Sequence, residues 1–147
     1  MAKSGARPAG PDAWEILAHL WQVMWSVLDE SAPALEAVGL TSKAFFLLSA
    51  VEEHPFPAEL ARAMHLPPPT VTYLVKQMEA GGFLERRGEP GDLRKFRLVL
   101  TDPGRRAIAS GRETLGAVFQ ARLTHLATRE VESFEWVLAR LSGPPRD

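Results

Sequence analysis

The sequence contains no cysteine, which excludes disulfide bonds, thiolate zinc sites and regulation by thiol oxidation. It also has no apolar run of the roughly 18 to 20 residues that a membrane span requires. Its start lacks the cationic residues and the apolar block of a secretory signal. We therefore expect a soluble protein that works in the cytoplasm.

Groups that could carry out catalysis are equally sparse. The four histidines follow no metal-ligand spacing and are scattered along the chain, at His19, His54, His65 and His125. Neither a glycine-rich phosphate loop nor a Ser-His-Asp arrangement is recognisable in the sequence. We predict that the chain is not an enzyme and that it binds no metal ion or cofactor.

An excess of positive charge is also missing, because the net charge is -1. A nucleic-acid binder usually gains much of its affinity from Lys and Arg side chains that contact phosphates. The charge is nevertheless uneven: residues 60–106 hold nine cations and five anions, a local charge of +4, and the rest of the chain carries -5. A basic middle between acidic ends is compatible with DNA binding.

The 147 residues, 46% of them hydrophobic, suffice for one globular domain with its own core. Residues 1–11 are rich in glycine, proline and small side chains, which predicts a disordered tail before a single domain at residues 12–142. A helix is predicted from Asp12, a suitable N-cap, to about Glu30. Its apolar residues span about twice the ~100° arc that a helix on a monomer's surface needs. We expect this helix to be covered from two directions.

Proline and glycine positions, together with apolar spacing, divide the rest of the chain into short elements. Residues 44–48 are almost entirely apolar and are predicted to be buried. The predicted elements are helices at residues 41–53, 58–64 and 68–80, a two-stranded antiparallel hairpin over residues 83–100, and helices from Thr101 or Asp102 and from about Arg129.

The helices at residues 58–64 and 68–80 have the residue pattern of a helix-turn-helix. Ala61 supplies the small residue that a close helix crossing requires, and apolar residues on both helices fill the space beneath it. The outer face of the second helix then presents polar side chains to base edges and phosphates: Thr70, Thr72, Tyr73, Lys76 and Gln77. The same pattern also fits two packed helices with a polar outer surface and no DNA-binding role, so this segment alone does not distinguish the two interpretations.

The order helix-turn-helix, charged hairpin, helix favours DNA binding, and here the sequence resembles the MarR family of bacterial regulators. The resemblance covers about residues 12–141 and is carried by residues 57–61, 70–72, 74–75 and 79–86. Its most specific part is a wing signature in which Asp and Arg stand one residue apart, followed after five residues by Leu-Thr. The signature is formed here by Asp92, Arg94, Leu100 and Thr101.

The resemblance implies a mainly α fold with a small β-hairpin wing, a winged helix-turn-helix. Residues 40–101 would form the DNA-binding lobe, and residues 12–32 and 102–142 would be dimerisation helices. The implied function is a transcription regulator, with repression as the favoured role, that binds near-palindromic duplex DNA as a homodimer.

The resemblance also implies contacts from the wing, because a narrow minor groove attracts an inserted guanidinium. Arg94 is the candidate for insertion, and Asp92 would orient it or a neighbouring arginine. Arg86 and Lys95 are further candidate contacts.

Several residues depart from the family pattern. Residues 67–69 are three prolines where the family often has a serine, and Tyr73 stands where arginine is common. Leu93 takes the place of a second wing arginine, and His65 that of a common glycine. We expect weaker, more salt-sensitive DNA binding or an unusual operator, with the fold intact.

The family further implies a small-molecule site between the lobes, commonly for aromatic or phenolic compounds. The candidates to line it are Trp21, Trp25, Phe45, Phe46 and Arg112. Bulky side chains also fill cores and interfaces, so a packing role for these residues stays open beside the effector site. A second alternative is a winged-helix module that contacts protein instead of DNA, which a thin basic surface would suit.

Overall fold

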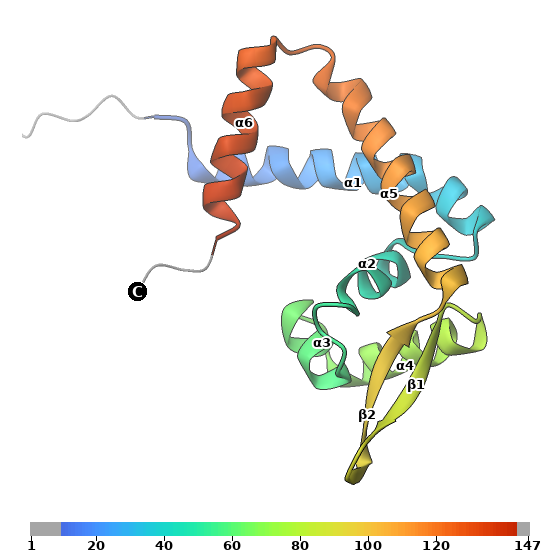
Figure 1. Ribbon diagram of the computed structural model, residues 1–147. Coiled ribbons are helices and arrows are strands. Elements are labelled where there is room, and N and C mark those ends of the chain that lie inside the picture. The colour runs from blue at the N-terminus through green and yellow to red at the C-terminus, as the bar shows by residue number, and fades with distance from the viewer. Residues whose placement is uncertain (1–9, 144–147) are drawn as a thin grey trace, which may run out of the picture.

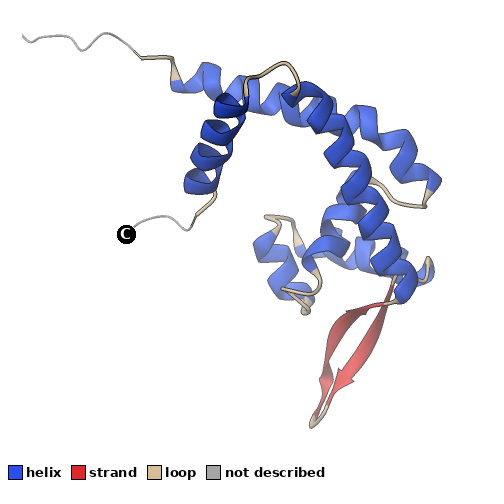
Figure 2. Cartoon of the chain, turned by 45° about the horizontal axis from the view of Figure 1, so that its top comes forward, coloured by secondary structure: helices blue, strands red, loops and turns tan. Residues whose placement is uncertain are grey.

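The computed structural model describes residues 10–143, which form two lobes (Figure 1). Most of the tail predicted at residues 1–11 lies outside the described residues. The elements are α1 (Ala13–Ala37), α2 (Ser42–Ala50), α3 (Pro57–Ala63), α4 (Pro68–Ala80), β1 (Leu84–Glu89), β2 (Asp92–Leu100), α5 (Asp102–Leu123) and α6 (Thr128–Leu141). One lobe holds α1, α6 and most of α5, and the other holds α2 to α4 and the hairpin, which projects from it (Figure 2). The predicted mainly α fold with a small hairpin is confirmed.

The first helix is longer than the sequence pattern predicts. The predicted end near Glu30 is wrong, because α1 continues through Pro33 to Ala37. Pro33 is exposed, so the carbonyl that loses its N–H donor there can face water. On either side of it, Ser31 and Leu35 are buried, and the packing of these last turns holds the helix together.

The second helix contributes four buried residues to the core, which it shares with α1, α3, α4, the hairpin and α5. It ends at Ala50, three residues before the predicted end, and most of its apolar body is buried. The prediction that all of residues 44–48 are buried is wrong for Phe46, which is 41% exposed, because five consecutive residues cannot share one face of a helix. The largest fully buried side chains of the core are Leu35, Leu40, Leu47, Leu48, Leu60, Leu84, Val51, Val71 and Val75.

The third and fourth helices form the predicted helix-turn-helix. Ala61 is buried where they meet, and Leu60 beside it is fully buried. In the turn, His65 has a φ of 51°, in the left-handed region that favours glycine. A histidine at this position therefore carries a backbone strain that glycine would not.

The wing is a two-stranded antiparallel hairpin closed by Pro90 and Gly91, whose φ is 88°. Its strands are in regular register from Leu84, opposite Leu100, to Gly88, opposite Phe96. The register then shifts, so that Glu89 faces Asp92 and residues 93–95 form a bulge near the tip.

The hairpin and α5 meet at a closely packed joint. The Thr101 hydroxyl accepts the Gly104 N–H (3.1 Å) and donates to the Gly82 carbonyl (2.6 Å). The Thr101 N–H donates to the Phe83 carbonyl (3.1 Å). A Cβ on Gly104 would overlap that same carbonyl. This joint fixes the start of α5 against the turn between α4 and β1.

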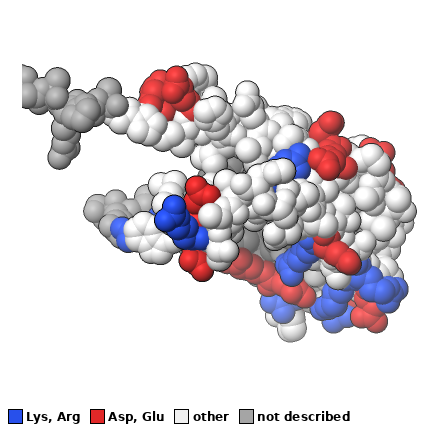
Figure 3. All heavy atoms as spheres, turned by 90° about the horizontal axis from the view of Figure 1, so that it is seen from above, with Lys and Arg blue, Asp and Glu red and all other residues white. Residues whose placement is uncertain are grey.

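The lobe of α1, α5 and α6 leaves much apolar surface uncovered. In α6, none of the side chains is buried. The large exposed side chains of α1 and α6 include Trp14, Leu17, Trp21, Met24, Trp25, Trp136, Val137 and Leu141. Figure 3 shows that much of this side of the molecule is uncharged. Within residues 10–143, every helix is too short or too polar to cross a membrane.

Candidate nucleic-acid interface

The helix α4 has one buried and one exposed face, as its sequence pattern predicts. Val71, Leu74, Val75 and Met78 are buried against the rest of the lobe. The polar face carries four exposed side chains and one half-buried side chain, Thr70; the exposed ones are Thr72, Tyr73, Lys76 and Gln77. These residues stand on a rigid helix that presents them to solvent together.

Hydrogen bonds within α4 define what this face can offer to a partner. The Gln77 side-chain amide donates to the Tyr73 hydroxyl (2.7 Å), and the Thr72 hydroxyl donates to the Pro68 carbonyl (3.0 Å). The Gln77 carbonyl oxygen, its second N–H and the Tyr73 hydroxyl proton remain available. Thr72 can still accept a hydrogen bond and presents its methyl group. Such groups can read base edges in a major groove.

The start of α4 differs from the usual anion-binding helix end. Residues 67–69 are prolines and have no N–H to offer. The next two N–H groups, of Thr70 and Val71, both donate to the Pro67 carbonyl (3.0 and 3.2 Å). A phosphate therefore finds no free backbone donor on residues 67–71, and side chains must supply the contact.

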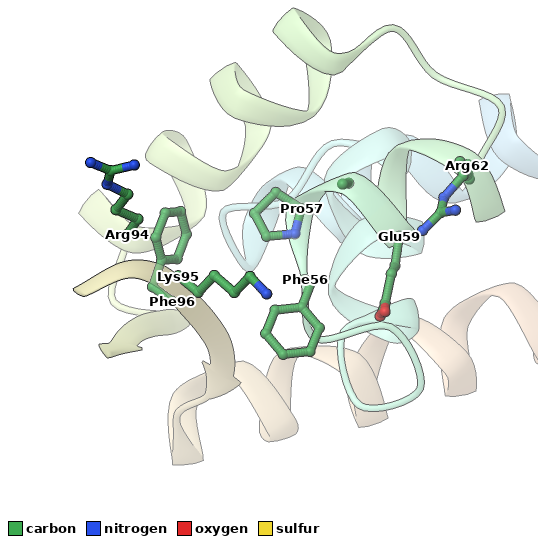
Figure 4. Close-up of a pocket in the computed structure, with 8 residues that line it drawn as sticks. Phe56, Pro57, Glu59, Arg62, Arg94, Lys95 and Phe96 are labelled. Atoms are coloured by element: carbon green, nitrogen blue, oxygen red, sulfur yellow. The ribbon is translucent and has the colours of Figure 1, made fainter. Parts of the chain in front are cut away.

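The wing tip presents Arg94 through a backbone bend that Asp92 stabilises. The Asp92 carboxylate accepts the Arg94 N–H (3.0 Å) and lies 3.9 Å from the Lys95 ammonium. Asp92 thus fixes the backbone below Arg94, whereas the sequence signature suggested that it orients a guanidinium. The exposed Arg94 side chain points away from Phe56, and Lys95 extends toward Phe56 (Figure 4).

Most other cations near the hairpin are already paired with carboxylates. Arg86 binds Glu79 (3.0 Å) and lies 4.6 Å above the ring of Phe96. Further ion pairs join Arg87 to Glu85 (2.6 Å), Arg97 to Glu89 (3.0 Å) and Arg105 to Glu52 (3.5 Å). Of the nine cations of residues 60–106, those outside any ion pair among the described residues are Arg62, Lys76, Arg94 and Arg106.

A cleft of about 510 Å³ separates the wing from α3 (Figure 4). Phe56, Pro57 and Phe96 give it apolar walls, and its charged lining residues are Arg62, Arg94, Lys95 and Glu59. The sequence pattern did not single out Phe56 or Arg62 as site residues. Arg62 was missed because α3 has only seven residues, too few for apolar spacing in the sequence to show which of its sides is exposed.

Of the five residues predicted to bind an effector, Trp25 is the one found in the lining of a groove between α1, α2 and α4. This groove has a volume of about 540 Å³, with Lys43, Tyr73 and Gln77 among the other lining residues. Trp21 packs on Trp25 with ring centroids 5.6 Å apart, but is not part of that lining.

The remaining three effector candidates are not part of the lining of that groove either. Phe45 is buried in the core, and Phe46 packs against it with ring centroids 5.2 Å apart. Arg112 is exposed on α5. Lys43, the cation that does line the groove, was missed because it precedes the apolar body of α2 and looks like an ordinary surface lysine.

Comparisons with known proteins agree with this architecture. Residues 38–95 match the model of the MarR family. The chain is similar in structure to the transcriptional regulator Tm0710 from Thermotoga maritima, with a TM-score of 0.65 and 26% identity over 88% of this chain and 93% of that one. A search of curated proteins gave no significant match.

Two structures of MarR from E. coli are also similar. The wild-type apo form gives a TM-score of 0.75 and 18% identity over 92% of this chain and all (100%) of that one. A mutant form, solved in complex with operator DNA, gives a TM-score of 0.70 and 19% identity over 90% of this chain and 99% of that one.

Proposed function

Because residues 38–95 form a winged helix of the MarR family, we propose that the chain is a DNA-binding transcription regulator. In this proposal it is a cytoplasmic repressor that binds near-palindromic duplex DNA as a homodimer. Residues 40–101 serve as the DNA-binding lobe, and residues 12–32 and 102–142 as dimerisation helices. The fold shared with the operator-bound E. coli MarR supports this assignment.

One observation carries the proposal: the exposed polar face of α4 and the exposed Arg94 belong to the same lobe. A recognition helix in the major groove and an arginine in the adjacent minor groove would need such a pair of projecting elements. Thr72, Tyr73 and Gln77 are the candidates to read bases. Lys76 and Arg94 supply cations that no described carboxylate neutralises.

The partner proposed for the exposed apolar surface is a second copy of this chain. A protein that works alone rarely exposes this many large apolar side chains on two helices. A twofold arrangement would cover α1 and α6 and would place two copies of α4 and of the wing on one duplex.

DNA selection with the purified protein, followed by binding measurements at fixed salt, tests the proposed function. The variants Arg94→Ala and Arg87→Ala form a matched pair, because both remove a wing arginine but Arg87 is already bound to Glu85. We expect Arg94→Ala to weaken binding by about tenfold or more, since each half-site loses a minor-groove cation, and Arg87→Ala to have little effect. Equal effects of the two variants would contradict the role of Arg94.

A second candidate function is a winged-helix module that contacts protein, and the extensive ion pairing of the wing favours it. The same selection distinguishes the two functions. A chain that ignores every duplex at low ionic strength is not a DNA-binding regulator.

The groove beside Trp25 supports a proposal for an effector. It lies between the dimerisation helix α1 and the recognition helix α4, and it combines an indole with the ammonium of Lys43. An aromatic carboxylate fits this chemistry, and we expect benzoate to raise the melting temperature and lower the DNA affinity. Lys43→Gln should abolish both effects. If benzoate, phenylacetate and phenol all leave the melting temperature unchanged, the effector proposal fails.

A further inference from the structure

The side chain of Arg86 points to the inner side of the wing. Side chains alternate along a strand, so Arg86 shares its face of β1 with buried Leu84. Across the hairpin it stands opposite Leu98, which is also buried. An arginine at such a position is directed toward the helices and not toward a ligand in front of the wing.

Two contacts use the guanidinium of Arg86. It donates to the carboxylate of Glu79 in the last turns of α4 (3.0 Å), and it lies 4.6 Å from the centre of the Phe96 ring on β2. Phe96 in turn packs against the hydrophobic core. The Glu79–Arg86–Phe96 cluster therefore connects the recognition helix, both strands of the wing and the core.

The connection matters because the joint between Thr101 and the turn holds the base of the wing, whereas Arg86 meets Glu79 farther along the hairpin. Gly81 and Gly82 link α4 to β1, and Gly82 has a φ of 76° with open space around it. An isolated two-stranded hairpin is only marginally stable in water. The angle of the wing must then be set by contacts between the hairpin and the helices.

We propose that the Glu79–Arg86–Phe96 cluster fixes the wing relative to α4, and that Arg86 is a positioning residue and not a DNA contact. The inference rests on the proposed function, because it concerns how Arg94 is held at the right distance from the base-reading face of α4. A wing that varies in angle would lose entropy when both grooves are engaged, and its DNA affinity would fall.

Glu79→Gln and Glu85→Gln test the cluster as a matched pair. Both remove one negative charge from an ion pair of the proposed DNA-binding lobe, so both change the net charge of the lobe by the same amount. Only Glu79 connects the wing to α4, since Glu85 binds Arg87 on its own strand. We expect Glu79→Gln to bind the selected duplex about twofold to fivefold more weakly than Glu85→Gln, the range set by an exposed ion pair. Equal or tighter binding by Glu79→Gln would mean that Arg86 is released to contact DNA.

The salt dependence of binding separates positioning from phosphate contact. We expect Arg86→Gln to weaken binding by about fivefold to tenfold, because it removes both the ion pair and the contact with Phe96. The slope of log K against log salt should not change. A slope smaller by about one for each protomer would identify Arg86 as a phosphate contact and would overturn the inference.

A distance measurement tests the cluster without DNA. The chain has no cysteine, so Ala63→Cys on α3 and Pro90→Cys at the wing tip, both exposed, give two unique sites for spin labels. We expect the distribution of distances between the labels to broaden in Glu79→Gln but not in Glu85→Gln. Identical distributions in the two variants would refute the inference. The distance measurement tests the inference even if no duplex binds the wild-type chain. Failure to bind any duplex would contradict the proposed function but not the role of the cluster.

Discussion

Gly104 lies where the start of α5 packs closely against the turn between α4 and β1. A Cβ there would overlap the Phe83 carbonyl, which already accepts the Thr101 N–H. We expect Gly104→Ala to lower the free energy of unfolding by about 1 to 3 kcal/mol or more, as overpacking does. Gly116 provides the control, because it lies in the same helix with open space around it. Gly116→Ala should raise the free energy by about 0.5 to 1 kcal/mol, since alanine favours a helix. Equal melting temperatures of the two variants would contradict this.

Ser31 is the second residue whose replacement has a clear expected result. It is fully buried in α1, and its hydroxyl has no hydrogen-bond partner among the described residues. Ser31→Ala should therefore raise the free energy of unfolding by about 1 kcal/mol, because an unsatisfied buried hydroxyl is removed. Ser26→Ala is the matched control on the same helix, where the hydroxyl bonds to Val23 and Arg122. Denaturation with urea measures both, and a loss of stability in Ser31→Ala would show that the hydroxyl has a partner.

At the scale of single elements, the start of α4 determines how the lobe can hold phosphate. Pro69→Ala would restore an N–H in the first turn, where the helix itself cannot use it. We expect tighter DNA binding by about twofold to tenfold, since helix N-terminal N–H groups attract anions, with little change in melting temperature. Unchanged affinity in a duplex titration would show that this end of α4 does not face a phosphate.

Elements whose pattern depends on local spacing could be predicted from the sequence. The bounds of α4 and its buried and exposed faces follow from apolar residues at helical spacing, which needs no knowledge of distant segments. The length of α1 could not be predicted in this way, because burial of Ser31 and Leu35 outweighs the effect of Pro33. The ion pair of Arg86 could not be predicted from the sequence either. Its pairing with Glu79, seven residues earlier, depends on how the hairpin folds back over the helix.

At the scale of the whole molecule, the apolar surface of α1 and α6 should set the oligomeric state. Trp21 and Trp136 are 63% and 59% exposed. We expect Trp21→Glu and Trp136→Glu to shift the chain from dimer to monomer in sedimentation experiments, because a charge buried in an apolar interface lacks a partner. DNA affinity should then fall by about a hundredfold, since the two half-sites are no longer bound together. Circular dichroism would confirm that each variant stays folded, and a wild-type chain that is monomeric at every concentration would contradict the dimer.

The lack of buried side chains in α6 has a consequence for the lifetime of the protein. A helix of 14 residues is only marginally stable by itself in water. Chains without a partner would open at this carboxyl-terminal segment, and open segments are where proteases cut. In the proposed homodimer, surplus single copies would then be degraded first, so that the amount of intact protein in a cell follows the amount of assembled pairs.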